Sequence, residues 1–212
     1  MDEHEQSELV RSWLRNNSGA LAGGLVVGLA GILGWQWWQH NQAQHRFDAA
    51  TTYQALQDAA ERKDAVVIDQ MAAELGSRYA NTPYGALGLL HLADQKLTAG
   101  DAEAAQSALL DAARAAQDPA LAGLAQLRLA RIQIEVGKAQ DALDSLAKLP
   151  ADGFTGLAAE ARGDALRVLG RSEEAQAAYQ DALSTLETGA PNRTIIEMKL
   201  ADMGAAPATP EA

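Results

Sequence analysis

Hydrophobic residues along this chain follow two patterns, one continuous near the N-terminus and one periodic over the rest. Residues 16–44 contain no Asp, Glu, Lys or Arg, and residues 19–38 at their centre are almost wholly apolar. From residue 42 onward, apolar residues recur at the intervals of an amphipathic helix, with Gly and Pro between the periodic stretches. No alternating run is long enough to suggest a strand. The pattern predicts an all-α protein.

The periodic part predicts a row of short helices joined by short turns. Pro119 and Pro150 lie at breaks between these helices, because proline is not tolerated inside a helix. We expect the first eight to form four antiparallel pairs and the last to follow alone. The expected ranges are roughly 40–61, 65–79, 84–98, 102–116, 120–136, 139–148, 155–169, 173–187 and 192–203.

Three segments share a spaced set of small residues, which indicates an internal repeat. Gly100, Gly137 and Gly170 mark the turns, at intervals of 37 and 33 residues. A small residue lies seven positions before each glycine and an alanine five positions after it, where paired helices come close: Ala93 with Ala105, Ala130 with Ala142, and Gly163 with Ala175. This pattern, with a period near 34, is typical of tetratricopeptide repeats, although the consensus Trp is missing from all three segments.

The regions beside the three repeats are expected to complete the array. Residues 40–79 predict one further helix pair, with four core residues: Tyr53, Leu56, Met71 and Leu75. Residues 192–203 predict a capping helix, because the end of a helical solenoid otherwise exposes its apolar face. Residues 204–212 carry no side chain suited to packing and are expected to be disordered.

The apolar stretch at residues 19–38 predicts a transmembrane helix. Twenty helical residues span about 30 Å, the thickness of a bilayer core, and Trp35, Trp37 and Trp38 gather at one end, where indoles prefer the headgroup level. The alternatives are a buried core helix and a cleaved signal peptide, but bulky Trp stands where a small-residue cleavage site would lie. The predicted fold is therefore an N-terminal transmembrane helix followed by a tetratricopeptide-repeat-like α-solenoid.

Basic residues beside the span predict its orientation. Arg11 and Arg15 precede it, and only Arg46 follows within the next twenty residues, which favours a cytoplasmic N-terminus. Residues 1–18 are then a cytoplasmic tail and residues 39–203 a periplasmic domain of a single-pass inner-membrane protein.

Four small residues share one face of the predicted span. At about 100° per residue, Ala20, Gly24, Gly28 and Gly31 fall within about 80° of each other. Such a stripe lets another membrane helix approach closely, so these residues form a candidate docking face. The alternative is that glycine is simply frequent in membrane spans.

Composition excludes several classes of protein. The formal net charge of −11 argues against nucleic acid as a partner, since phosphate binding needs clustered Lys and Arg. The absence of Cys excludes disulfide scaffolds, Cys-ligated zinc and thiol nucleophiles. The four histidines, His4, His40, His45 and His91, include no pair at the spacing of a helical metal site. With no phosphate-binding or nucleophile motif either, we expect no enzyme, cofactor, metal or small-molecule substrate.

The remaining mode of action is protein recognition by the solenoid. The first helix of each tetratricopeptide repeat lines a concave groove, and counting from the turn glycines assigns residues to it. The candidate groove residues are Leu90, Asp94, Leu127, Arg131, Glu160, Asp164 and Arg167. Such a groove would hold an extended or helical protein segment, unless several of these side chains pack internally.

The whole chain also resembles the YfgM-type ancillary subunits of the bacterial Sec translocon. The matching stretches are residues 15–22, 34–38, 82–93, 127–131, 162–166 and 198–200. The resemblance implies association with SecYEG and with PpiD, a membrane-anchored periplasmic chaperone, and a role in passing newly translocated envelope proteins onward. It carries over no catalytic residue.

These observations together predict a non-enzymatic accessory protein of the Sec translocon, which binds a chaperone, secreted or envelope clients, or both. The main alternative is a tetratricopeptide scaffold of another envelope complex, for cell division or outer-membrane assembly. An enzyme of unfamiliar type is a third, and it would need a deep polar pocket with convergent carboxylates or His91.

Overall fold

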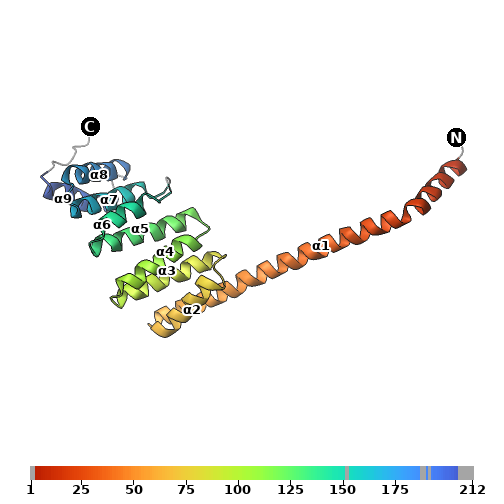
Figure 1. Ribbon diagram of the computed structural model, residues 1–212, viewed down its shortest axis with the longest axis horizontal. Coiled ribbons are helices and arrows are strands. Elements are labelled where there is room, and N and C mark those ends of the chain that lie inside the picture. The colour runs from red at the N-terminus through yellow and green to blue at the C-terminus, as the bar shows by residue number, and fades with distance from the viewer. Residues whose placement is uncertain (1–2, 151–152, 187–189, 191, 205–212) are drawn as a thin grey trace. The chain divides into compact units, whose positions relative to one another are not determined.

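The structure is a computed structural model that describes residues 3–150, 153–186, 190 and 192–204. Within those residues it is all-helical, with no strand (Figure 1). It divides into two compact units, Met1–Phe47 and Asp48–Ala212. The predicted disordered tail lies outside the described residues from position 205 onward.

Helix α1, Glu3–Glu61, contains the whole uncharged stretch and also the first predicted helix of the array. The sequence analysis expected two elements here, but no Gly or Pro lies between Trp38 and Phe47 to end the first. Among the described residues, no single helix is both long and apolar enough to span a membrane. Two helical segments that meet at a 48° bend, Arg11–Ala20 and Ala22–Glu61, pass the same test together by length and composition.

The remaining helices end within two residues of the predicted positions. They are α2 Ala65–Ser77, α3 Pro83–Thr98, α4 Ala102–Ala115, α5 Pro119–Glu135, α6 Ala139–Leu146, α7 Thr155–Val168, α8 Ser172–Thr185 and α9 Arg193–Asp202. Proline opens α3 and α5 at the first helical position, where its missing N–H has no partner to lose.

The predicted repeat turns are confirmed in their backbone geometry. Gly100, Gly137 and Gly170 have φ angles of +82°, +79° and +74°, the left-handed conformation that favours glycine. At each turn the glycine N–H bonds to the carbonyl three residues back, and the next N–H bonds to the carbonyl five residues back. The small residues on either side are buried at the helix contacts: Ala93, Ala105, Ala130, Ala142 and Ala175 are at most 1% exposed.

A fourth turn of the same geometry joins α1 to α2, and lysine occupies the glycine position. Lys63 has φ +57° and repeats both hydrogen bonds, with its N–H on Ala60 and the N–H of Asp64 on Ala59. It precedes Gly100 by 37 residues, the interval that separates Gly100 from Gly137. The end of α1 and α2 therefore form a further helix pair in register with the three repeats.

Apolar contacts hold this array together along its whole length. Leu56 and Leu75 are fully buried between α1 and α2, with Tyr53 and Met71 packed against them, so the predicted core of this pair is confirmed. At the other end, Ile196 and Leu200 of α9 are fully buried against α7 and α8. Helix α9 thus covers the last pair, as predicted for a capping helix.

Candidate partner-binding face

Charged side chains connect the first helices of successive pairs. Arg128 on α5 donates to both carboxylate oxygens of Asp94 on α3, each at 3.1 Å. On the next step, Nη2 of Arg131 on α5 lies 4.0 Å from Oε2 of Glu160 on α7. We call the surface that carries Asp94, Arg128, Arg131, Glu160 and Lys199 the inner face.

The ladder of ion pairs ends on the capping helix. Nζ of Lys199 on α9 lies 2.9 Å from Oε1 of Glu160 and 2.7 Å from Oδ2 of Asp164, both on α7. The paired charges therefore alternate from helix to helix: acidic on α3, basic on α5, acidic on α7 and basic on α9. Since the Glu160 and Lys199 side chains are only 12% and 25% exposed, this last pair is better shielded from solvent than the pair at α3.

Tyr179 on α8 extends this network into the core. Its ring is fully buried against Gly163, and its hydroxyl donates to Oδ1 of Asp164 at 2.7 Å. Burial is the main cause that raises the pKa of the Tyr179 hydroxyl, and the bond to Asp164 raises it further. Arg167 acts in the opposite direction on the same pKa, so it lies near the hydroxyl while its own side chain is exposed.

Two of the seven predicted groove residues lie in the core instead. Leu90 is 5% exposed and packs between α3 and its neighbours, and Leu127 is 2% exposed in the cluster of α5, α6 and α7. The assignment to the groove is wrong for these two, because their positions face the second helix of their own pair. The remaining five, Asp94, Arg131, Glu160, Asp164 and Arg167, are polar, and all but Arg167 belong to the ion-pair ladder.

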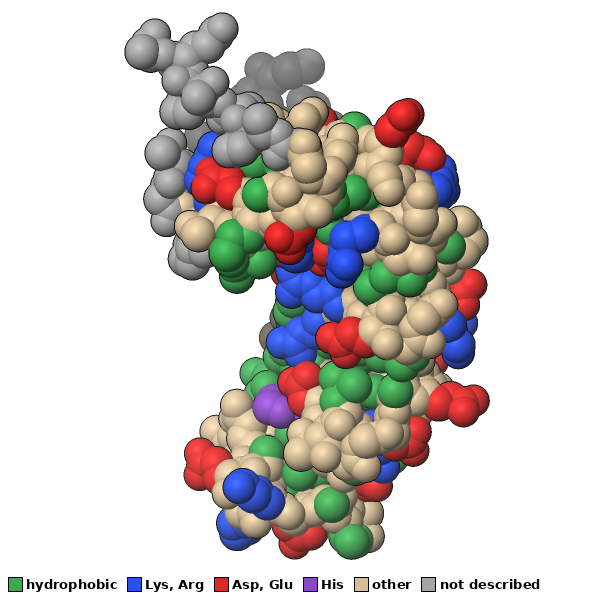
Figure 2. All heavy atoms as spheres, turned by 90° about the vertical axis from the view of Figure 1, so that its left-hand side faces the viewer, with side chains coloured by type: hydrophobic (Ala, Val, Ile, Leu, Met, Phe, Trp, Pro, Cys, Tyr) green, Lys and Arg blue, Asp and Glu red, His purple; other side chains and the backbone are tan. Residues whose placement is uncertain are grey.

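Figure 2 shows the second unit with a hollow on one side, and Lys and Arg side chains gather along that hollow beside acidic ones. Counting residues from the turn glycines predicts the charged residues of this face but not the ion pairs that they form with one another. That pairing matters for binding, because a partner's charges must compete with those already in place.

A pocket opens beside Asp94, where α1 and α2 meet α3. Its volume is about 460 Å³, and it lies wholly within the second unit. Apolar and polar side chains both line it, and Lys63, Asp94 and Thr98 are exposed polar residues at its rim. The lining residues are Ala60, Lys63, Ala65, Ile68, His91, Asp94, Gln95, Thr98 and Ala99. His91 is oriented there by the hydroxyl of Tyr53, 3.1 Å from its Nε2. The sequence gives no signal for this pocket, because Ala60, Lys63, Ala65 and Ile68 come from the helix pair that lacks the repeat signature.

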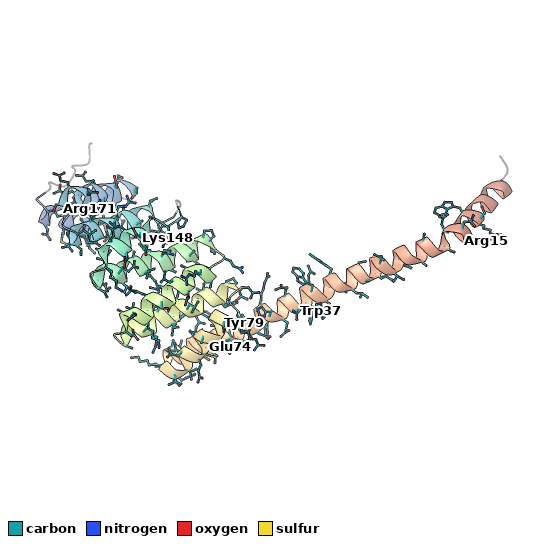
Figure 3. All side chains as sticks on the ribbon, viewed as in Figure 1. Arg15, Trp37, Glu74, Tyr79, Lys148 and Arg171 are labelled. Atoms are coloured by element: carbon teal, nitrogen blue, oxygen red, sulfur yellow. The ribbon has the colours of Figure 1, made fainter. Side chains whose placement is uncertain are left out.

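The predicted docking stripe on α1 lies within the first unit. A Cβ built on Gly24, Gly28 or Gly31 would meet no atom within 4 Å, and Ala20 is exposed. Large apolar side chains of the same helix are also exposed, among them Val27 at 73% and Trp37 at 69%. Figure 3 shows the side chain of Trp37 standing off α1, with Arg15 near the opposite end of the apolar stretch. That the stripe docks a partner helix stays a prediction.

Two kinds of candidate site, a metal site and a polar catalytic pocket, have few suitable side chains among the described residues. Among them, no group of three or more His, Asp or Glu side chains is placed to hold a metal ion. The carboxylates of the inner face are committed to Arg128, Arg131 and Lys199, and the pocket beside Asp94 is lined mostly by apolar surface.

Comparison with known proteins agrees with this architecture. The tetratricopeptide repeat-like domain family matches residues 11–205. The ancillary SecYEG translocon subunit of Escherichia coli (strain K12) is 30% identical over 94% of this chain and 95% of its own length. Proteins of the same name from Aggregatibacter actinomycetemcomitans and Haemophilus influenzae are 26% and 24% identical, over 94% and 86% of the chain and 97% and 89% of their own lengths. The chain therefore belongs to the tetratricopeptide-repeat-like family of ancillary SecYEG translocon subunits, a family of adaptors without catalytic activity.

Proposed function

We propose that this protein is a single-pass inner-membrane adaptor of the Sec translocon. Residues 19–38 cross the membrane, residues 1–18 lie in the cytoplasm and residues 39–203 lie in the periplasm. The periplasmic array binds protein partners: SecYEG itself, a PpiD-type chaperone, and newly translocated secreted or envelope proteins. The observation that carries this proposal is the likeness to ancillary SecYEG translocon subunits over nearly the full length of both chains.

The surface of α1 supports the membrane anchor. The large apolar side chains from Leu25 to Trp38 are 48–73% exposed, which in water would cost roughly 25 cal/mol for each Å². A bilayer removes that cost, and Trp35 and Trp38, whose ring centroids lie 5.1 Å apart, suit its interface. An anchor also raises the local concentration of the array beside the channel, so that weak contacts suffice for capture.

The inner face supports partner binding. Asp94, Arg128 and Arg131 keep 40–58% of their side chains exposed although each is ion-paired. Exposed ion pairs contribute little to folding, at most about 1 kcal/mol. A partner can therefore rearrange these ion pairs at small cost. Arg167 of α7, near the Tyr179 hydroxyl, adds a further exposed cation beside the inner face.

Site-specific photocrosslinking in membranes tests this proposal. Probes at Gly24 and Gly28 sample the span, and probes at Arg131 and Arg167 sample the inner face. We expect translocon subunits from the first pair of positions and a chaperone or nascent client from the second. Charge reversal of both arginines should then reduce capture by the inner face alone.

Mild-detergent copurification separates the proposal from its main alternative. Recovery of cell-division or outer-membrane assembly proteins without SecYEG would identify the chain as a scaffold of another envelope complex. Unchanged partner capture by the Arg131→Glu, Arg167→Glu variant would remove the inner face from the proposal, while leaving the anchor intact.

A further inference from the structure

We propose that the pocket beside Asp94 binds an apolar side chain of a partner protein whose neighbouring residues are acidic, with Lys63 holding the carboxylate. This inference rests on the proposed function, since it specifies the kind of segment that the array captures. The pocket lies between the first of the three repeats and the helix pair that precedes it.

The lining of the pocket indicates the apolar part of the occupant. Its apolar lining residues are Ala60, Ala65, Ile68 and Ala99, and most of the lining surface is apolar. A volume of about 460 Å³ accommodates one residue of a partner protein with a large side chain, including the backbone atoms of that residue. Asp94 lines the pocket and also belongs to the inner face, so the occupant can continue along that face as an extended or helical segment.

The charges at the rim indicate the acidic part. Asp94 is already neutralised, because both of its oxygens accept from Arg128. Within the described residues, the Lys63 side chain is exposed and forms no ion pair, and the hydrogen bonds of this residue are made by its backbone. The rim therefore presents one uncompensated ammonium group, which complements a carboxylate.

The backbone of Lys63 makes its presence at the rim informative. Its φ of +57° places it in a conformation that suits glycine, and glycine occupies the three equivalent turns at 100, 137 and 170. Folding alone would thus be served better by glycine at position 63. A strained residue at the edge of a pocket points to a role in binding.

Peptide binding to the purified full chain in detergent tests the inference. The probe is a labelled peptide Gly-Ser-Glu-Leu-Glu-Ser-Gly, followed by fluorescence anisotropy. Two matched peptides replace both Glu by Gln, or Leu by Ala. We expect the Gln peptide to bind about threefold more weakly and the Ala peptide about tenfold more weakly.

Two variants with matched controls assign the binding to this pocket. Ala99→Trp fills the pocket and should weaken binding of the Glu-Leu-Glu peptide about tenfold, by steric exclusion. Ala147→Trp places the same change at an equivalent exposed helix end on α6 and should leave the affinity unchanged. Lys63→Gly should abolish the preference for Glu over Gln without lowering the melting temperature, whereas Lys138→Gly should retain that preference.

The outcomes decide between the pocket and the proposed function. Absence of saturable binding by the native chain, or equal affinity of the Ala99→Trp variant, overturns the pocket assignment even if crosslinking still finds the translocon. Peptide binding that follows the expected pattern in a chain that never crosslinks to the translocon supports the pocket and contradicts the proposed function instead.

Discussion

Lys63 and Gly100 occupy the same position in successive helix turns, with φ angles of +57° and +82° and the same pair of backbone hydrogen bonds. The two turns share their backbone hydrogen bonds but differ in the conformational energy of the residue at the left-handed position. Glycine adopts the left-handed conformation freely, whereas the Cβ of lysine crowds the neighbouring carbonyl. Among the four equivalent turns at residues 63, 100, 137 and 170, the first is therefore the strained one.

Replacing Lys63 by Gly should stabilise the array. The variant relieves the left-handed strain, and we expect the free energy of unfolding to rise by about 0.5–1 kcal/mol. Urea unfolding followed by circular dichroism measures the change. Gly100→Ala is the converse control and should lower stability by about 1 kcal/mol. A loss of stability in Lys63→Gly would mean that the lysine side chain supports the turn.

The same turn shows why the sequence revealed three repeats and not four. The repeat signature depends on small residues seven before and five after a glycine, and here those positions carry Leu56 and Ile68 around Lys63. Both side chains are buried, at 0% and 5% exposure, so they fill the contact that alanine makes elsewhere. Apolar periodicity still located both helices, because it depends on which face is buried and not on side-chain size.

Residue counting located the inner face only in part, for a related reason. The period fixes which helix a residue belongs to, so Asp94, Arg131 and Glu160 were placed on the first helices of their pairs. The period does not fix the rotation of each helix about its axis, and Leu90 and Leu127 lie in the hydrophobic core and not on the inner face. Contacts between distant positions, such as Arg128 with Asp94 or Lys199 with Glu160, depend on the stacking angle of the pairs and have no local signal.

Gly163→Ala should destabilise the last repeat. A Cβ at this position would lie 2.5 Å from a ring carbon of Tyr179, which is fully buried and held by its bond to Asp164. Because the ring has no room to retreat, we expect a loss of about 1–3 kcal/mol in thermal or urea unfolding. Gly34→Ala is the matched control, since its Cβ meets nothing within 4 Å. Equal stability of both variants would contradict the close packing of α7 on α8.

Lys199→Met should loosen the capping helix. The change removes the cation that Glu160 and Asp164 share and leaves Glu160 with Arg131, 4.0 Å away, so we expect a cost of about 1–3 kcal/mol. Hydrogen exchange should show faster exchange in α9 than in α3. Lys96→Met, which breaks the more exposed pair with Asp69, is the control and should have a smaller effect. Slow exchange of α9 in the Lys199 variant would show that Ile196 and Leu200 hold the cap alone.

Tyr179 should make the array less stable at alkaline pH. Burial and the bond to Asp164 raise the pKa of its hydroxyl above the usual 10, so the unfolded chain releases this proton first. The protonated Tyr179 hydroxyl makes its full contribution to the free energy of unfolding below pH 10, and this contribution falls as the pH rises toward the folded-state pKa. Tyrosinate absorbance should show late titration in the folded chain, and Tyr179→Phe should remove its latest component. Titration of all tyrosines together near their usual pKa would contradict the burial of this hydroxyl.

Paired leucines in the glycine stripe should separate membrane docking from membrane insertion. Gly24→Leu with Gly28→Leu adds bulk where a partner helix would approach, yet within the described residues each new Cβ has only its own helix backbone within 4 Å. We expect insertion and the fold of the array to persist, while recovery of the translocon from mild detergent falls several-fold.

The control for the stripe places two leucines on the opposite face of α1. Ala22→Leu with Val26→Leu lies about 180° away at about 100° per residue and should leave translocon recovery unchanged. Because both double variants carry two introduced leucines in the same part of the span, a difference between them reports which face the leucines occupy. Equal recovery with all three chains would show that glycine in this helix serves no docking role, and that association depends on the array beyond Phe47.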